Sequence, residues 1–399
     1  MIKKCILAGL VICLGSFTFG QTWEEKTPYP GSPRHHPATF VIDGMAYLLT
    51  GSTATAYTKD FYKYDPTDDS WEELPEFPGA ARSFSYAVAN NGKGYIGFGV
   101  SDADFLNDLW EYDPSTETWT QLTSCPCAKR AHPAFVVQDD RIFVGLGNFS
   151  SNLKDWWEYN INTDSWRQLP DLPGPERHHP YHFAVGGSVY VGLGHGVGMA
   201  IYKDWYRWDL DTESWEIMND FPDQARVAGT QFNIGNRGFV LSGDGDDHST
   251  MATGEFWEYD YQTDTWEQKP PHPGVSRWAP GSFTIGNVVY FTSGQVREGN
   301  PGEGLQNDLW SFEVESLVGT AADALETIAI YPNPTDEVLH VEGLAEISSV
   351  QLFNGVGKFI REEHLAGGQI DVAYLNSGLY FISLTTQSGE VKRLKFIKK

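Results

Sequence analysis

Cysteine is scarce in this sequence, which excludes a disulfide framework. The 399 residues contain 4 cysteines. Cys5 and Cys13 fall in the N-terminal segment, so the rest of the chain has only Cys125 and Cys127. Two cysteines are too few to stabilise a chain of this length by disulfide cross-links. A strained bridge between these two close thiols and a pair of free thiols both remain open at this stage.

Basic residues and long hydrophobic runs are also few. Lysine and arginine number 28 against 53 acidic residues, which gives a formal net charge of −25. Nucleic acid is therefore not an expected partner, because phosphate binding needs a basic surface. The one long apolar run ends at Phe19 and is too short for a membrane span. With two lysines before it and Gly20 near the expected cut, it predicts a secretory signal over residues 1–20.

Tryptophan, glycine and proline are abundant instead, with 14, 41 and 22 copies. Six tryptophans are each followed eleven residues later by an arginine, and each arginine seventeen residues later by a glycine. The tryptophans are Trp23, Trp71, Trp119, Trp166, Trp215 and Trp266; the arginines are Arg34, Arg82, Arg130, Arg177, Arg226 and Arg277; the glycines are Gly51, Gly99, Gly147, Gly194, Gly243 and Gly294. A fixed spacing over a period near fifty residues predicts an array of identical supersecondary units.

Each repeat contains four short apolar stretches, strands a to d, separated by turn residues. A lone four-stranded sheet cannot bury both of its faces, so neighbouring sheets must stack on it, and radial stacking gives a β-propeller. The aromatic residue of strand c always lies nine residues before the next tryptophan. These aromatic residues are Tyr62, Trp110, Trp157, Tyr206, Trp257 and, in the last repeat, Trp310.

The chain resembles Kelch-repeat propellers. It shares with them an arginine before strand a, a glycine closing strand b, an aromatic residue and a tyrosine on strand c, and a tryptophan on strand d. It departs from them in having one constant glycine where the family has two. The resemblance covers residues 22–314 and implies an all-β fold, a six-bladed Kelch propeller. Since Trp310 has no following tryptophan, residues 22–26 are expected to supply the outer strand of blade six.

Length variation is confined to the connection between strands b and c. From the repeat glycine to the strand-c aromatic residue the distances are 11, 11, 10, 12, 14 and 16 residues. The longest of these b–c loops span residues 244–256 and 295–309. Because insertions and binding residues gather on loops carried by a rigid scaffold, this face is the predicted functional surface. The d–a connections, which carry the arginines, lie on the same face.

The candidate ligand-binding residues lie on or beside that face. They are Arg34, Arg82, Arg130, Arg177, Arg226, Arg277, His36, His132, His179 and Trp278. The arginines have two alternative roles: bracing adjacent blades through carboxylates or carbonyls, or converging at the channel mouth to bind an anion. Arginines that are all used in salt bridges between blades would contradict anion binding.

Metal binding is not expected from the sequence. His36, His132 and His179 each follow an arginine by two residues, and three histidines can hold a metal, but they come from blades one, three and four. Asp244, Asp246 and Asp247 form an oxygen-rich turn without the spaced ligand set of a calcium loop. No cofactor is predicted.

A second domain follows a linker at residues 315–326. Its features are a Tyr-Pro-Asn-Pro opening at Tyr331, a Gly-Leu-Tyr-Phe strand at Gly378 and a lysine-rich end, and short alternating strands indicate a small Ig-like β-sandwich. Residues 327–399 closely resemble the type A C-terminal sorting domain of the type IX secretion system of Bacteroidota. This resemblance implies export by that machinery and a secreted or outer-membrane-surface location.

Two functions remain open for the propeller. The first is binding of a glycan or an extracellular protein through the b–c and d–a face. The alternative is an enzyme, since six-bladed Kelch proteins include bacterial sialic-acid mutarotases, which use arginines near the channel on a carboxylated sugar. Such an enzyme needs a general base beside the arginines; Glu176 is a nearby carboxylate, but nothing in the sequence singles it out. The sequence favours the binding protein and does not decide whether the chain is an enzyme.

Overall fold

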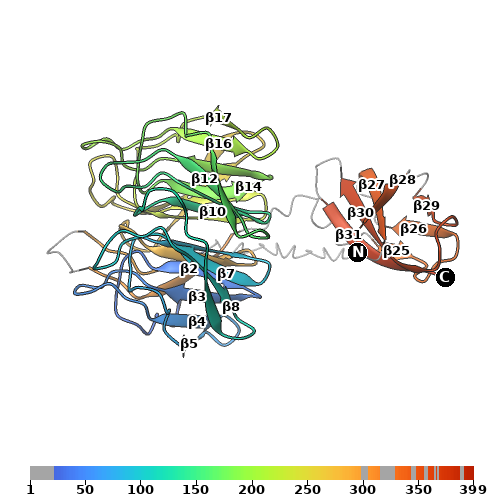
Figure 1. The fold of residues 1–399 in the computed structure, drawn as a ribbon, viewed down its shortest axis with the longest axis horizontal. Coiled ribbons are helices and arrows are strands. Elements are labelled where there is room, and N and C mark those ends of the chain that lie inside the picture. Colours follow the sequence, from blue (N-terminus) through green and yellow to red (C-terminus); the bar gives the residue numbers. More distant parts are fainter. Residues whose placement is uncertain are drawn as a thin grey trace, which may run out of the picture. The chain divides into compact units, whose positions relative to one another are not determined.

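The computed structural model describes residues 22–297, 304–314, 329–342, 347–354, 358–363, 365, 368–386 and 391–399. The predicted signal (1–20) and linker (315–326) lie outside these residues. The chain divides into two compact units, Met1–Val314 and Glu315–Lys399. The regular secondary structure described is entirely β (Figure 1). In the described residues no helix has the length and apolar character to cross a membrane.

The first unit contains six antiparallel four-stranded sheets. Blades one to three contain β2 (Ala38–Ile42), β3 (Met45–Leu49), β4 (Phe61–Asp65), β5 (Ser70–Leu74), β6 (Tyr86–Asn90), β7 (Lys93–Gly97), β8 (Leu109–Asp113), β9 (Thr118–Leu122), β10 (Ala134–Gln138), β11 (Arg141–Gly145), β12 (Trp156–Asn160) and β13 (Ser165–Leu169). Blades four to six contain β14 (Tyr181–Val185), β15 (Ser188–Gly192), β16 (Trp205–Asp209), β17 (Ser214–Met218), β18 (Thr230–Ile234), β19 (Arg237–Leu241), β20 (Gly254–Asp260), β21 (Thr265–His272), β22 (Gly281–Ile285), β23 (Val288–Thr292), β24 (Leu309–Glu313) and β1 (Glu24–Lys26).

The six sheets close into a ring. The first strand of each blade packs against the first strand of the next, in the order β2, β6, β10, β14, β18 and β22, and β22 packs back against β2. The N-terminal strand β1 pairs with β24, with Glu25 opposite Trp310, and completes the sixth sheet. This pairing covers the outer edge of β24 and ties the N-terminal strand into the last blade. The prediction of an all-β propeller is confirmed.

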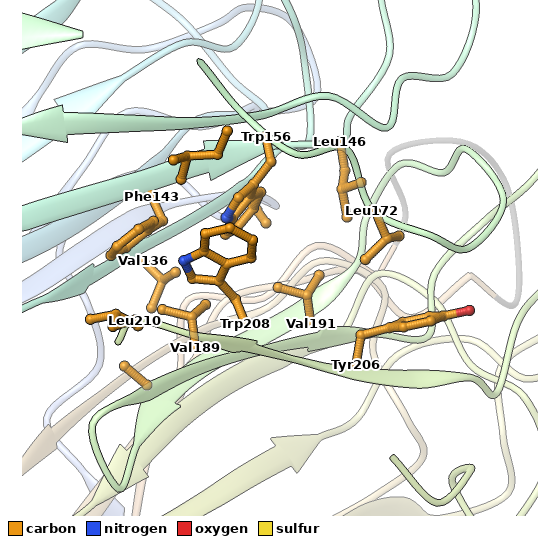
Figure 2. Close-up of a cluster of buried hydrophobic side chains, with 13 residues drawn as sticks. Val136, Phe143, Leu146, Trp156, Leu172, Val189, Val191, Tyr206, Trp208 and Leu210 are labelled. Carbon is orange, nitrogen blue, oxygen red and sulfur yellow. The ribbon is translucent and has the colours of Figure 1, made fainter. Parts of the chain in front are cut away.

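Hydrophobic side chains between neighbouring blades hold the ring together. Figure 2 shows one such cluster, in which Trp156 of β12 and Trp208 of β16 lie among the aliphatic side chains of blades three and four. Both tryptophans are almost completely buried. Because each sheet is apolar on both faces, each blade needs a neighbour on both sides.

The second unit has two antiparallel sheets. One is ordered β25-β26-β29 and the other β28-β27-β30-β31. Their strands are β25 (Ala329–Tyr331), β26 (Val338–Glu342), β27 (Ile347–Asn354), β28 (Phe359–Glu363), β29 (Gln369–Asp371), β30 (Gly378–Thr386) and β31 (Val391–Lys398). Leu339 and Ile370 of the first sheet share one buried cluster with Leu352, Ile382 and Phe396 of the second. The two sheets therefore enclose a common core; the Ig-like topology stays a prediction.

Candidate functional site

Each repeat arginine is buried and pairs with a carboxylate of its own blade. The carboxylate stands two residues before the strand-c aromatic residue. Five of the pairs are bidentate, with N···O distances of 2.5–2.7 Å, and the fifth blade uses a single contact of 2.6 Å. The pairs are Arg34–Asp60, Arg82–Asp108, Arg130–Asp155, Arg177–Asp204, Arg226–Glu255 and Arg277–Asp308.

Arg130 illustrates the surroundings of these pairs. Its guanidinium also donates to the carbonyl oxygens of Leu146 and Ala128, both at 3.0 Å. Asp155 accepts a further hydrogen bond from the indole of Trp157 at 2.8 Å. Burial alone raises the pKa of Asp155, but the hydrogen bonds and the charge of Arg130 outweigh it and hold that pKa below 3.8. The donors of the guanidinium are thus used inside the blade.

The backbone of the repeat joins one blade to the next. Each repeat glycine donates its N–H to the carbonyl oxygen of the following blade's arginine, at 2.8–3.0 Å. All six glycines have a positive φ between 86° and 110°, which only glycine adopts readily. The bonds run from Gly51 to Arg82, Gly99 to Arg130, Gly147 to Arg177, Gly194 to Arg226, Gly243 to Arg277 and Gly294 to Arg34. This interlock between blades accounts for the constant glycine.

The six guanidinium groups therefore do not form a free cationic ring at the channel mouth. Five arginines are fully buried and Arg277 is 6% exposed. Of the two roles considered from the sequence, the geometry matches bracing through carboxylates, but each carboxylate belongs to the arginine's own blade and not to an adjacent one. The side-chain pairs brace the interior of each blade, and the backbone bonds brace neighbouring blades. The carboxylates were missed in the sequence, although their constant position relative to strand c was visible there.

The residue two positions after each arginine lies at one end of the channel. These residues are His36, Phe84, His132, His179, Ala228 and Ala279, and all have a positive φ between 50° and 61°. Several are joined around the axis by backbone hydrogen bonds, such as His36 N–H to the Ala279 carbonyl at 2.8 Å. The left-handed backbone breaks the strand alternation that would place the histidines beside the arginine side chains. The histidines instead meet one another.

His36, His132 and His179 form a compact cluster. The Nε2 atoms of His36 and His179 are 2.9 Å apart, and the rings of His132 and His179 have centroids 3.5 Å apart. One potential ligand nitrogen from each of the three lies within 4.8 Å of the others. Burial lowers the pKa of all three, that of His132 to about 3, so the imidazoles are neutral near pH 7. We call these three residues the axial histidine cluster.

Four further histidines, which were not singled out in the sequence, extend the axial histidine cluster. His35 Nδ1 lies 2.6 Å from His36 Nδ1. His178 Nε2 lies 3.1 Å from His195 Nδ1, and the rings of His195 and His248 are 4.5 Å apart. Burial lowers the pKa of His35 and His178 to about 4. The paired histidines at 35–36 and 178–179 were the available signal in the sequence.

Trp278 lies beside this cluster and is half-buried. The rings of His35 and His36 contact its ring at centroid distances of 4.7 Å. The Arg297 guanidinium covers its face at 5.2 Å, and that guanidinium is paired with Asp244 at 2.5 Å. The indole is therefore engaged by protein groups on several sides.

The aspartates of the fifth b–c loop have separate surroundings. Asp244 is fully buried, and burial raises its pKa despite the Arg297 pair. Asp246 and Asp247 are exposed, and Asp247 accepts the Ser249 N–H at 2.9 Å. Within the part of the chain that the structure describes, only the axial histidine cluster brings together three or more His, Cys, Asp or Glu side chains closely enough to hold one metal ion.

A cavity of about 290 Å³ occupies the channel and is lined by the first strands of all six blades. His36 and His179 belong to its lining. His182 and Gln231 approach each other there at 3.3 Å, and Ser85 Oγ is buried without a hydrogen-bond partner among the described residues. None of its described lining residues is Asp, Glu, Lys or Arg. The cavity therefore presents neutral polar and apolar groups.

The b–c loops of blades three and four expose apolar side chains. Phe149 is 44% exposed, Val197 68% and Met199 69%. Phe149 contacts Phe105 of the preceding b–c loop at a centroid distance of 5.2 Å. We call Phe149, Val197 and Met199 the loop patch. In the described propeller, Ile217 of β17 is the other large apolar side chain with comparable exposure.

The d–a connections contain the cysteine pair and Glu176, two further features noted in the sequence. Cys125 and Cys127 are joined by a disulfide, with Cα atoms 5.1 Å apart, and both are buried against the blade core. Glu176 is exposed in the connection before Arg177. It does not take part in the arginine pairs described above.

Comparisons with known proteins match each of the two units to a family. The family model of the Attractin/LZTR1 β-propeller matches residues 46–295, and that of the secretion system C-terminal sorting domain matches residues 329–399. The propeller and the sorting domain are thereby confirmed. No curated protein matches the chain. The solved structure of YjhT has a TM-score of 0.56 and 18% identity, covering 62% of this chain and 88% of YjhT; at this identity the likeness indicates the fold alone.

Proposed function

Because the chain belongs to the Attractin/LZTR1 β-propeller family and has a sorting domain at its C-terminal end, we propose that it is an extracellular binding protein whose b–c loops recognise another protein. The sorting domain indicates secretion or a cell-surface location, and it implies contact with the type IX machinery. The propeller is then the part that acts outside the cell.

The loop patch is the observation that carries this proposal. Its three residues come from neighbouring blades and lie on connections of the face where loop length varies. Exposed apolar side chains that the core does not need are candidate contacts for a partner, and Phe and Met are enriched in protein interfaces. Each blade core is already filled by buried clusters, so these residues are not needed for folding.

A protein partner fits better than a glycan. Sugar binding favours an open aromatic face, whereas the face of Trp278 is covered by Arg297. Val197 and Met199 are not aromatic and offer no flat ring for sugar stacking, and the ring of Phe149 already contacts that of Phe105. Met199 is flexible and adapts to an apolar partner surface.

No observation favours the mutarotase alternative. That function requires free arginines beside a general base, but the repeat arginines are engaged by carboxylates. The described lining of the channel cavity contains no charged side chain. Neutral groups there leave a carboxylated sugar without a cationic partner.

Replacing the loop patch residues together, as Phe149→Ser, Val197→Ser and Met199→Ser, should abolish binding of the partner without changing stability. Removing the apolar anchors of an interface costs affinity because a few such residues carry most of the binding energy. The measurement is quantitative mass spectrometry of surface and extracellular proteins of the source cells retained on immobilised wild-type and variant protein. At least one protein should be retained by the wild type and reduced more than tenfold with the variant.

Ile217→Ser is the matched control, since Ile217 is 76% exposed but lies on an outer strand. The protein retained by the wild type should bind this variant equally. A retained set that is the same for all three proteins would contradict the role of the loop patch. A glycan array in parallel tests the other ligand class: glycan binding lost in the triple variant, with no protein retained, would replace the proposed partner.

A further inference from the structure

We propose that the axial histidine cluster is a binding site for a divalent transition-metal ion, with Zn²⁺ the best match. This inference is independent of partner binding by the loop patch. It depends on the spacing of His36, His132 and His179, on the hydrogen bonds that orient their rings and on the chemistry of the three ligands.

The spacing of the nitrogens is close to that of a three-histidine site. Zn–N bonds of about 2.0–2.1 Å in a tetrahedron place ligand nitrogens ~3.3 Å apart. One nitrogen from each of the three rings already lies within 4.8 Å of those of the other two, and the Nε2 atoms of His36 and His179 are 2.9 Å apart. The rings of His132 and His179 have centroids 3.5 Å apart and planes tilted by 36°, so they must rotate for three nitrogens to point at one ion.

His132 is oriented as a metal ligand. Its Nδ1 lies 2.9 Å from Asn148 Oδ1, and because an amide oxygen only accepts, Nδ1 carries the hydrogen. Its Nε2 therefore presents a lone pair, and that atom is buried with no hydrogen-bond partner in the described residues. An orphaned buried acceptor is costly, and a metal ion would satisfy it. Ligand histidines are held in this way by a hydrogen bond from the other ring nitrogen.

His36 and His179 share one hydrogen between their Nε2 atoms, at 2.9 Å. Metal binding requires a lone pair on both atoms. The hydrogen therefore moves to the Nδ1 of the ring that carries it, and both rings stay neutral. In the tautomer in which His179 Nε2 is the donor, neutral His36 carries its own hydrogen on Nδ1 and donates it to His35 Nδ1 at 2.6 Å. Only the His179 hydrogen then has to move to Nδ1.

The surroundings favour a borderline cation over a hard one. The three ligands are imidazoles, which suit Zn²⁺, Cu²⁺ and Ni²⁺, whereas Ca²⁺ and Mg²⁺ need oxygen ligands. Further imidazoles lead outward from the cluster: the His178 ring lies 5.1 Å from that of His179, and His195 links His178 to the loop residue His248. They offer transient ligands along an entry path, and the net charge of −25 raises the local concentration of cations.

The test uses tag-free full-length protein stripped with a chelator and titrated with Zn²⁺ alone by calorimetry. The expected result is one equivalent bound to the wild type. Co²⁺ as a probe should give the intense visible absorption of a tetrahedral site. His132→Gln should weaken Zn²⁺ binding at least 100-fold. Asn148→Ala, which removes only the orienting hydrogen bond, should weaken it about 10- to 100-fold.

His340→Gln is the control, since His340 lies in the C-terminal unit and stacks on Tyr331. It should bind Zn²⁺ as the wild type does. Tryptophan fluorescence verifies that the propeller of each variant is folded, and bound Zn²⁺ should raise the unfolding temperature of the wild type but not of His132→Gln. Absence of stoichiometric binding to the wild type, or equal binding by folded His132→Gln, would overturn the proposal.

Discussion

Replacing Asp155 by alanine should lower the free energy of unfolding of the propeller by about 3–5 kcal/mol. The variant leaves the Arg130 guanidinium buried, with 0% exposure, and without its carboxylate. An uncompensated buried charge is costlier than the loss of the pair itself. Urea unfolding followed by tryptophan fluorescence measures the change. All 14 tryptophans lie between Trp23 and Trp310, so the signal reports the propeller alone.

The same pair predicts a pH dependence. The pKa of Asp155 is held below its ordinary 3.8 in the folded protein, so the folded state favours the ionised carboxylate. The stabilisation is complete above the unfolded pKa and is lost as the pH falls through the folded pKa. The difference in stability between wild type and Asp155→Ala should therefore be constant from about pH 5 to 7 and shrink below about pH 4.

An exposed ion pair serves as the control for Asp155. Lys59 and Glu76 are 2.8 Å apart, with side chains 42% and 62% exposed. Lys59→Ala should change the free energy of unfolding by less than about 1 kcal/mol. Similar small effects for Lys59→Ala and Asp155→Ala would contradict the bracing role assigned to the repeat arginines.

Substituting alanine for Gly147 should cost about 3–5 kcal/mol of propeller stability. Gly147 has a φ of +86°, and a Cβ there would lie 2.5 Å from the carbonyl oxygen of Ala131. The neighbour is backbone, so the strand must shift. That shift disturbs the 2.8 Å bond from the Gly147 N–H to the Arg177 carbonyl, which joins blade three to blade four. Urea unfolding followed by tryptophan fluorescence is again the measurement.

Gly92→Ala isolates the conformational part of this cost. Gly92 has a φ of +75°, but a Cβ there meets nothing within 4 Å. Its substitution should cost only the ~1–2 kcal/mol of a left-handed alanine. If Gly92→Ala and Gly147→Ala were equally destabilised, the interlock between blades would not be the reason for the constant glycine.

The sequence was sufficient to predict the architecture because the same local pattern of strands and turns occurs six times. Turn residues, alternating apolar stretches and the constant tryptophans predicted the sheets, and the unpaired Trp23 pointed to the N-terminal strand that pairs with β24. The motif at Tyr331 and the lysine-rich end were enough to indicate the sorting domain. Short-range spacing carries this information, since it reflects hydrogen bonding within single blades.

The candidate site could be predicted only in part. The loops of variable length were located from spacing, and Phe149, Val197 and Met199 lie on them. Exposure of these side chains could not be read from the sequence, because it depends on how far neighbouring loops cover each other. The arginines were identified, but the choice between bracing and anion binding depended on whether each guanidinium points into its blade or toward the channel mouth.

The sequence by itself determined a six-bladed propeller with a sorting domain, the period that spaces the arginines and glycines, and the face on which length varies. Only the tertiary structure decided that the arginines are taken by carboxylates and that His36, His132 and His179 meet. The physical reason is ring closure. It brings equivalent positions of non-adjacent blades to one axis, and the positive φ at those positions separates the histidines from the arginines. Residues some 50 to 140 apart in the chain become neighbours by that symmetry, which no local pattern encodes.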